Sequence, residues 1–103
     1  MKMIAHNVYF TLIDDSEAAV QTLLAACRKY LVDHPGIVSF ACGTLAVDHV
    51  RDVNDRDWDV GLHIVFTDKA AHDRYQDAPR HHQFVAESKP NWKRARVFDT
   101  VLA

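Results

Sequence analysis

The order in which hydrophobic periodicities follow one another constrains this chain more than any other feature of its sequence. Residues 4–12 alternate between two faces, which is the spacing of a β-strand. Residues 20–31 then repeat apolar side chains at helical intervals. Asp14 and Glu17, at capping-box spacing, predict the start of this helix. The His-Pro-Gly sequence at 34–36 predicts its end, because a residue before proline avoids helical angles and glycine permits a turn.

The rest of the chain predicts three more strands and a second, broken helix. Residues 37–47 are rich in Val, Phe and other strand formers, and residues 58–66 and 92–101 alternate. Between the last two strands, one helix ends near Asp77. A second helical segment begins at Pro79, with Asp77 as its expected cap, because proline is favoured in the first turn of a helix.

The resulting order, β-α-β-β-α-β, predicts an α+β protein with a ferredoxin-like fold, built as one domain over residues 1–103. In this plan a four-stranded antiparallel sheet carries its helices on one face. The opposite face carries Asn7, Tyr9, His63 and Val65. Aromatic and β-branched side chains on such a face are explained if a second sheet packs against them. The pattern therefore predicts a homodimer joined through the open sheet face.

Composition narrows the classes of partner and the cellular location. The net charge of −2 does not favour binding to nucleic acid or to anionic membranes. No apolar run approaches the roughly 18 residues of a membrane span, and His6 and Asn7 interrupt the apolar residues near the start. Cys27 lies on the apolar face of the first helix, and Cys42 lies in the second strand. We expect both to be buried, reduced thiols, which predicts a cytoplasmic protein.

Several short motifs, spread over nearly the whole chain in a consistent order, resemble those of the stress-responsive dimeric α/β-barrel family. They are His6-Asn7-Val8-Tyr9-Phe10, Pro35-Gly36-Ile37, Asp59, Phe66, Tyr75, Pro79-Arg80-His81, Trp92 and Phe98-Asp99. The resemblance implies a homodimer whose two sheets form one barrel, in a family whose members mostly have no assigned activity.

One branch of that family, the plant polyketide cyclases, uses a histidine and a tyrosine in a pocket between sheet and helices. The resemblance places this pair at His81 and Tyr75, with His6 as a supporting polar group. It departs from the branch at Val60, where the cyclases have a further histidine.

The residues themselves point to the same region. On the helix after Pro79, His81 and Phe84 share one face, which directs His81 toward the core. In the first strand, His6 and Phe10 share a face. We therefore predict a largely apolar pocket between sheet and helices with His6, Phe10, Val60 and Phe84 as ligand contacts. A histidine in it can act as a general base and a tyrosine hydroxyl can stabilise an oxyanion, so His81 and Tyr75 are the candidate catalytic residues.

Three functions fit this pattern. The first is a protein that binds a small apolar or aromatic molecule without turnover. The second is a cofactor-independent enzyme, polyketide-cyclase-like or monooxygenase-like, in which His81 and Tyr75 do the chemistry. The third is a purely structural stress-related dimer, in which the histidines are hydrogen-bonded core residues. A haem-degrading barrel is a further possibility that nothing in the chain singles out, so no cofactor is predicted.

The remaining polar residues carry weaker hypotheses. The seven histidines form no His-x-His or His-Glu-x-x-His motif, so no metal site is predicted. Residues 48–57 are rich in aspartate and predict a mobile, solvated loop. His63, on the same face as Asp59, is expected at the rim of the dimer interface. Arg94 and Arg96 share a face that the acidic loop or Asp59 can neutralise.

Overall fold

The expected element order is confirmed in a computed structural model that describes residues 1–103. The strands are β1 (Ile4–Leu12), β2 (Ile37–Thr44), β3 (Val60–Phe66) and β4 (Trp92–Val101). The helices are α1 (Glu17–Tyr30), α2 (Lys69–Asp77) and α3 (Pro79–Ser88), and a 3-10 turn, η1 (Lys89–Asn91), leads into β4. All strand pairs are antiparallel, in the order β2-β3-β1-β4. The fold is the predicted ferredoxin-like β-α-β-β-α-β plan.

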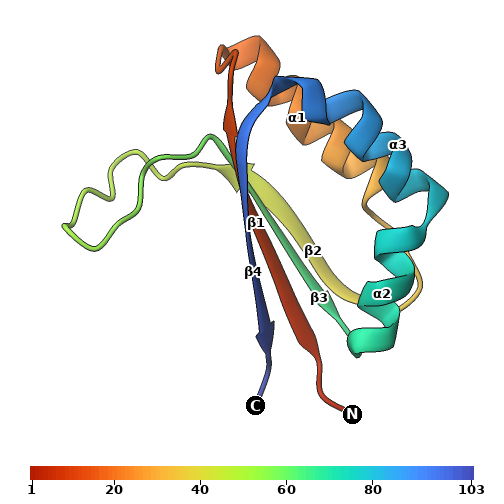
Figure 1. Ribbon diagram of the computed structural model, residues 1–103. Helices are drawn as coiled ribbons and strands as arrows, with labels where there is room; N and C mark the ends of the chain where they lie inside the picture. Colours follow the sequence, from red (N-terminus) through yellow and green to blue (C-terminus); the bar gives the residue numbers. More distant parts are fainter.

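The two faces of the sheet differ as the alternation predicts. Figure 1 shows the three helices on one face, while the long loop between β2 and β3 projects from the other side. Along β1, side chains that point toward the helices are buried and the others are half-buried. Tyr75, Phe10 and Phe66 are the largest fully buried side chains of the core, which lies between the sheet and the helices. We refer to the two sides as the helix face and the open face.

The start of α1 differs from the prediction. Ser16, and not Asp14, is the N-cap, and its hydroxyl accepts a hydrogen bond from the Ala19 backbone N–H at 3.3 Å. The Asp14 carboxylate instead accepts one from the backbone N–H of Ser16 at 3.0 Å. The predicted capping box is wrong because this short turn places Ser16 at the first helical turn and leaves Asp14 outside it.

The segment between α1 and β2 shows why glycine is needed at its end. The His34 ring lies 2.7 Å from the carbonyl of Tyr30, the last residue of α1, and so satisfies one of the helix's free carbonyls. Gly36 has φ +88°, and a Cβ atom there would lie 2.4 Å from the Cβ of Ala71. The predicted turn at 34–36 is therefore confirmed, and it brings the start of β2 against α2.

The broken second helix is also confirmed, with a different cap at the break. The Asp68 carboxylate caps α2 by accepting from the Ala71 backbone N–H at 2.8 Å. At the break, Ala78 and not Asp77 is the N-cap of α3, and no side chain caps this helix. Because Pro79 has no N–H, the first turn of α3 has one donor fewer to satisfy, and the expected aspartate cap is not required.

Candidate functional site

A cavity of about 170 Å³ lies on the helix face, between the sheet and the helices α2 and α3. Its polar lining residues are His6 of β1, Tyr75 and Gln76 of α2, and His81 of α3. Phe10 and Trp92 are among its apolar lining residues. The helices leave part of β4 uncovered, and Val97 on this wall is 51% exposed. The structure thus brings four of the predicted site residues, His6, Phe10, Tyr75 and His81, to one cavity.

Val60 and Phe84 lie elsewhere. Val60 is fully buried and Phe84 is 2% exposed, and both belong to the packed core. The Phe84 ring packs against Phe10 and Trp92, with ring centroids 6.2 and 5.9 Å apart. Neither residue lines the cavity, so the ligand contacts predicted for them would require the core to open.

The two candidate catalytic residues are in contact across the α2–α3 break. The ring centroids of Tyr75 and His81 are 4.8 Å apart, with an interplanar angle of 65°. Burial, and to a smaller extent the neighbouring histidines with His82 the strongest, lower the pKa of His81 to about 4. His81 is therefore neutral at pH 7. Burial also raises the pKa of the Tyr75 hydroxyl above its usual value, so that it stays a hydrogen-bond donor.

Two residues that line this cavity have a nitrogen atom without a hydrogen-bond partner. His81 Nδ1 and Trp92 Nε1 are buried, belong to cavity-lining residues and have no hydrogen-bond partner in the protein. A buried polar group without a partner costs about 1–3 kcal/mol, and most proteins leave few of them. Two residues that line one cavity therefore each carry a nitrogen that a polar partner would stabilise.

A second polar group on the helix face joins three elements. His6 Nδ1 lies 2.5 Å from the Asp99 carboxylate of β4, and the two residues face each other in the β1–β4 register. The ring of His72, on α2, is 4.5 Å from the His6 ring, centroid to centroid. Sequence reasoning missed Asp99 and His72 as partners of His6. The alternation of β4 places Asp99 on the helix face, but the strand register that sets it opposite His6 is a property of the folded sheet.

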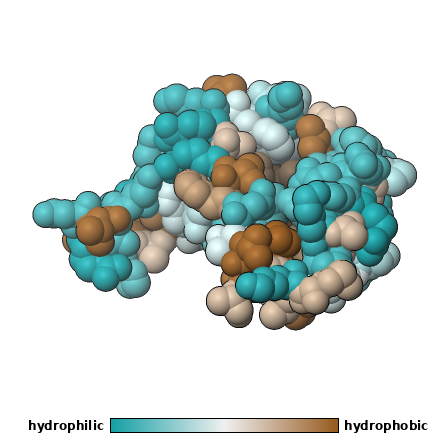
Figure 2. Space-filling view, turned by 60° about the horizontal axis from the view of Figure 1, so that its bottom comes forward, coloured by the Kyte–Doolittle hydropathy of each residue, from teal (hydrophilic) through white to brown (hydrophobic).

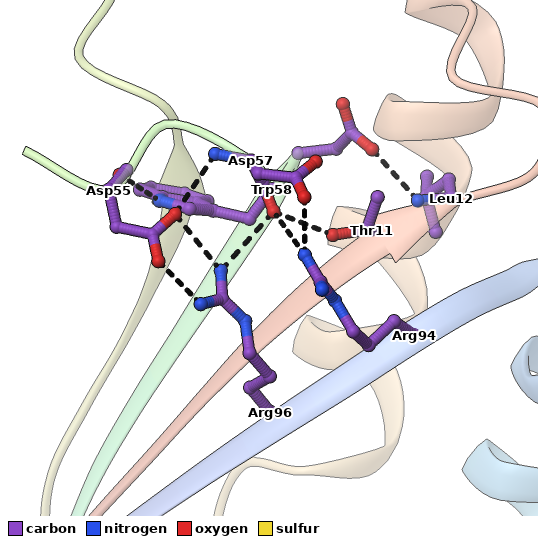
Figure 3. Close-up of polar contacts among 8 residues, drawn as sticks. Thr11, Leu12, Asp55, Asp57, Trp58, Arg94 and Arg96 are labelled. Atoms are coloured by element: carbon purple, nitrogen blue, oxygen red, sulfur yellow. Dashed lines mark hydrogen bonds and ion pairs between the residues drawn. The ribbon is translucent and has the colours of Figure 1, made fainter.

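The open face carries an aromatic cluster. The Tyr9 ring lies 5.0 Å from Trp58, 5.7 Å from His63 and 6.0 Å from Phe98, centroid to centroid. His63 Nδ1 contacts the Asn7 side-chain oxygen at 2.8 Å. The Asp59 carboxylate is turned to β1 and accepts from the Leu12 backbone N–H at 2.8 Å, an interaction drawn in Figure 3.

The loop between β2 and β3 is tied to the same face by ion pairs, shown in Figure 3. Arg94 lies 2.5 Å from the Asp57 carboxylate, and Arg96 contacts both carboxylate oxygens of Asp55 at 2.5 and 3.2 Å. The hydrogen bonds from Arg96 lower the pKa of Asp55 to about 2. The acidic loop thus neutralises both arginines, as predicted, and we call these four residues the loop cluster.

The rest of this loop, residues 45–54, forms an arm between the end of β2 and the loop cluster. In Figure 2 the arm extends away from the body of the molecule, with a hydrophobic residue exposed on it. Val47, Val50 and Val53 are 65%, 68% and 85% exposed. A concave space of about 350 Å³ under the arm is lined by residues that include Tyr9, Trp58 and Phe98. The open face therefore combines exposed apolar side chains with a hollow beside them.

Several solved protein structures have a fold similar to that of this chain. A ferredoxin-like protein of the stress-responsive barrel family from Mesorhizobium loti is 28% identical, with a TM-score of 0.82, covering 100% of this chain and 99% of that chain. A dimeric ferredoxin-like protein of unknown function from Thermobifida fusca is 20% identical, with a TM-score of 0.81, covering 98% and 92%. A hydroxynitrile lyase from Passiflora edulis is 17% identical, with a TM-score of 0.79, covering 99% and 94%.

The other comparisons are brief. No curated protein matches the chain. None of its helices combines the length and the apolar character that a membrane crossing requires. The family model of the stress-responsive A/B barrel domain matches residues 4–102, in agreement with the motifs and the fold. The chain belongs to the stress-responsive A/B barrel domain family.

Proposed function

We propose that this protein is a homodimer that binds a small, mainly apolar or aromatic molecule in the helix-face cavity. The observation that carries the proposal is a cavity with mostly apolar walls, two of whose lining residues, His81 and Trp92, each have a buried nitrogen without a partner, Nδ1 and Nε1. An apolar ring gains from burial against Phe10 and Val8, and one polar substituent can satisfy a free nitrogen.

The volume of the cavity sets the size of the ligand. Cavities that hold drug-sized molecules measure about 300–1,000 Å³. An apolar cavity of about 150 Å³ is known to hold benzene. At about 170 Å³, this cavity therefore fits a molecule with one ring and a small polar group. Phenol and benzaldehyde are suitable probes.

Binding is tested by titrating the protein with phenol and following ligand-detected NMR and thermal unfolding. We expect saturable binding that is weakened roughly tenfold in His81→Gln, about the effect of one lost hydrogen bond in a buried site. His82→Gln is the matched control, because His82 lies next in the chain but is exposed. Equal binding by the two variants would remove His81 from the site. No binding of any probe by the wild type would leave the purely structural dimer as the best account.

A second candidate is a cofactor-independent enzyme of acid–base type. A neutral His81 packed against the Tyr75 ring, in a cavity that solvent can reach, is an arrangement in which a base and an oxyanion-stabilising donor could meet one substrate. The hydroxynitrile lyase with the same fold shows that this scaffold can support an enzyme. A base whose pKa is about 4 is weak at neutral pH, however, and binding without turnover is therefore our first proposal.

The enzymatic candidate is tested with mandelonitrile, a one-ring molecule whose cleavage releases benzaldehyde. Turnover that disappears in both Tyr75→Phe and His81→Gln, with thermal stability retained, would favour it. Because Tyr75→Phe keeps the ring and removes only the hydroxyl, this variant separates chemistry from packing. Binding of phenol without turnover of mandelonitrile would support the first proposal for this class of substrate.

The dimer is supported by the exposed aromatic and aliphatic side chains of the open face and by the dimeric Thermobifida fusca relative. Phe98, at the aromatic cluster, is 52% exposed in the single chain. We expect the wild type to sediment as a dimer and Phe98→Glu to sediment as a monomer, because an unpaired charge is costly at a buried interface. Gln83→Glu, on an exposed part of α3, is the control and should remain dimeric. A wild type that is monomeric at all concentrations would contradict the proposal. The cytoplasmic location stays a prediction.

A further inference from the structure

A group of potential metal ligands stands beside the cavity, and the proposed ligand binding does not use it. His6, His72 and Asp99 each offer one ligand atom, and these three atoms all lie within 4.8 Å of one another. They come from β1, α2 and β4, which are far apart in the sequence. The search for short histidine motifs in the sequence therefore could not find them.

We propose that His6, His72 and Asp99 form a binding site for a divalent transition-metal ion of the zinc type. Two imidazole nitrogens and one carboxylate oxygen are a donor set that Zn²⁺ accepts, and that Fe²⁺ also accepts with positions left open. A site with three protein ligands leaves at least one coordination position for water or for another molecule. Because His6 also lines the cavity, the metal site borders the space in which a ligand is proposed to bind.

The geometry needs only a small adjustment. With bonds of about 2.0–2.1 Å, two ligand atoms in a tetrahedral zinc site lie about 3.3 Å apart. Ligand atoms at the 4.8 Å limit must therefore approach by about 1.5 Å, whereas His6 Nδ1 and the Asp99 oxygen, now 2.5 Å apart, must separate by about 0.8 Å. The Asp99 side chain is 45% exposed and His72 is half-buried, so both can move, while His6 is held with its side chain 5% exposed.

The contacts around these residues suit the assignment. His6 Nδ1 and the Asp99 carboxylate lie 2.5 Å apart, so a cation between them would replace their mutual hydrogen bond with two bonds to the metal. The side-chain nitrogen of Gln76, one helical turn away, donates to Nε2 of His72 at 3.1 Å and leaves Nδ1 as the nitrogen that would meet the cation. The exposure of Asp99 at the edge strand β4 gives the ion a path from solvent.

The test is a titration of the chelator-treated protein with Zn²⁺ by calorimetry, repeated with Co²⁺ and followed by visible absorption. We expect one ion per chain and a rise in the unfolding temperature. His72→Gln and Asp99→Asn should each weaken binding by roughly tenfold or more, since even outer-shell partners of a metal contribute this much. These two are preferred to a His6 variant, because His6 is buried and its loss can unfold the chain.

Two controls separate this site from casual binding to surface histidines. His49→Gln and His82→Gln remove exposed histidines and should bind Zn²⁺ as the wild type does. Equal affinity in His72→Gln, Asp99→Asn and the wild type would overturn the proposal, as would an absence of Zn²⁺ binding. Phenol binding in the Asp99→Asn variant tests the cavity separately, so failure of the metal site and failure of the proposed function give different results.

Discussion

Two polar groups of residues lie on opposite faces of the same sheet, and they are satisfied to different degrees. On the open face, the loop cluster pairs Asp55 with Arg96 and Asp57 with Arg94, leaving Arg96 Nε as its one buried donor without a partner (Figure 3). On the helix face, His81 and Trp92 each leave a buried nitrogen unpaired beside a cavity. Both clusters are built from ordinary charged and aromatic residues. The first group holds a loop to the sheet, whereas the second surrounds the cavity in which we propose that a ligand binds.

The largest effect expected from this comparison is on core packing. Phe84→Ala, on the helix face, should lower the free energy of unfolding by about 3–5 kcal/mol, because its ring is 2% exposed and leaves a cavity. Phe98→Ala, on the open face, should change it by about 0.5 kcal/mol or less at low protein concentration. Urea denaturation, repeated at several protein concentrations, measures the free energy of unfolding of both variants. If Phe98→Ala costs the same at every concentration, the ring has a structural role in the single chain and not in a dimer.

Acid should destabilise the folded chain through the helix face at a higher pH than through the open face. In the unfolded chain His81 takes up a proton as the pH falls through about 6.5, but the folded chain resists protonation until about pH 4. The free energy of unfolding should therefore decrease between pH 6.5 and 4, by an amount that the partial exposure of His81 reduces. His81→Gln should flatten this part of the profile. A difference between wild type and variant that does not vary with pH in this range would argue against a buried neutral histidine.

The open face should respond only in a lower range. The folded pKa of Asp55 is about 2 and its ordinary value is 3.8, so its contribution is present above pH 3.8 and is lost as the pH falls toward 2. Asp55→Asn should remove the pH dependence in this lower range and leave the range from 6.5 to 4 unchanged. Thermal unfolding measured from pH 7 to pH 2 follows both effects in one series. An effect of Asp55→Asn above pH 4 would mean that the two faces are coupled.

The smallest expected effect is on global stability when the loop cluster is broken. Solvent screens exposed ion pairs, so Asp55→Asn should barely change the free energy of unfolding at neutral pH. Hydrogen exchange should instead accelerate at residues 45–59, whose base the pair holds to β4. Asp73→Asn breaks a similar exposed pair with Lys69 on α2 and should leave loop exchange unchanged. Equal exchange in both variants would show that the ion pairs do not hold the loop.

The fold was predictable because its determinants are local. Alternation at residues 4–12 and helical spacing at 20–31 are set by neighbours in the chain, and they predicted both the elements and the buried faces correctly. Errors fell at the ends of elements. Ser16 and Ala78 are the caps where Asp14 and Asp77 were expected, because competing turn hydrogen bonds of similar energy decide the first residue of a helix.

The site was predictable only where one residue could be read from its own element. The faces of β1 and α3 directed His6 and His81 inward, and the structure places both at the cavity. Phe84 and Val60 were also directed inward, but a face pattern cannot distinguish a cavity wall from solid core. That distinction depends on how well side chains from different elements fill the space between them.

The sequence by itself determined the order of the elements, the two faces of the sheet and the inward direction of His6, Phe10 and His81, since these follow from periodicity along a single segment. Tyr75 was placed by the family resemblance. Only the tertiary structure decided that Asp99 meets His6 across 93 residues, that His72 joins them and that a cavity remains beside them. The physical reason is that strand register and side-chain packing arise between segments, where no local pattern in the chain specifies the distance between two residues.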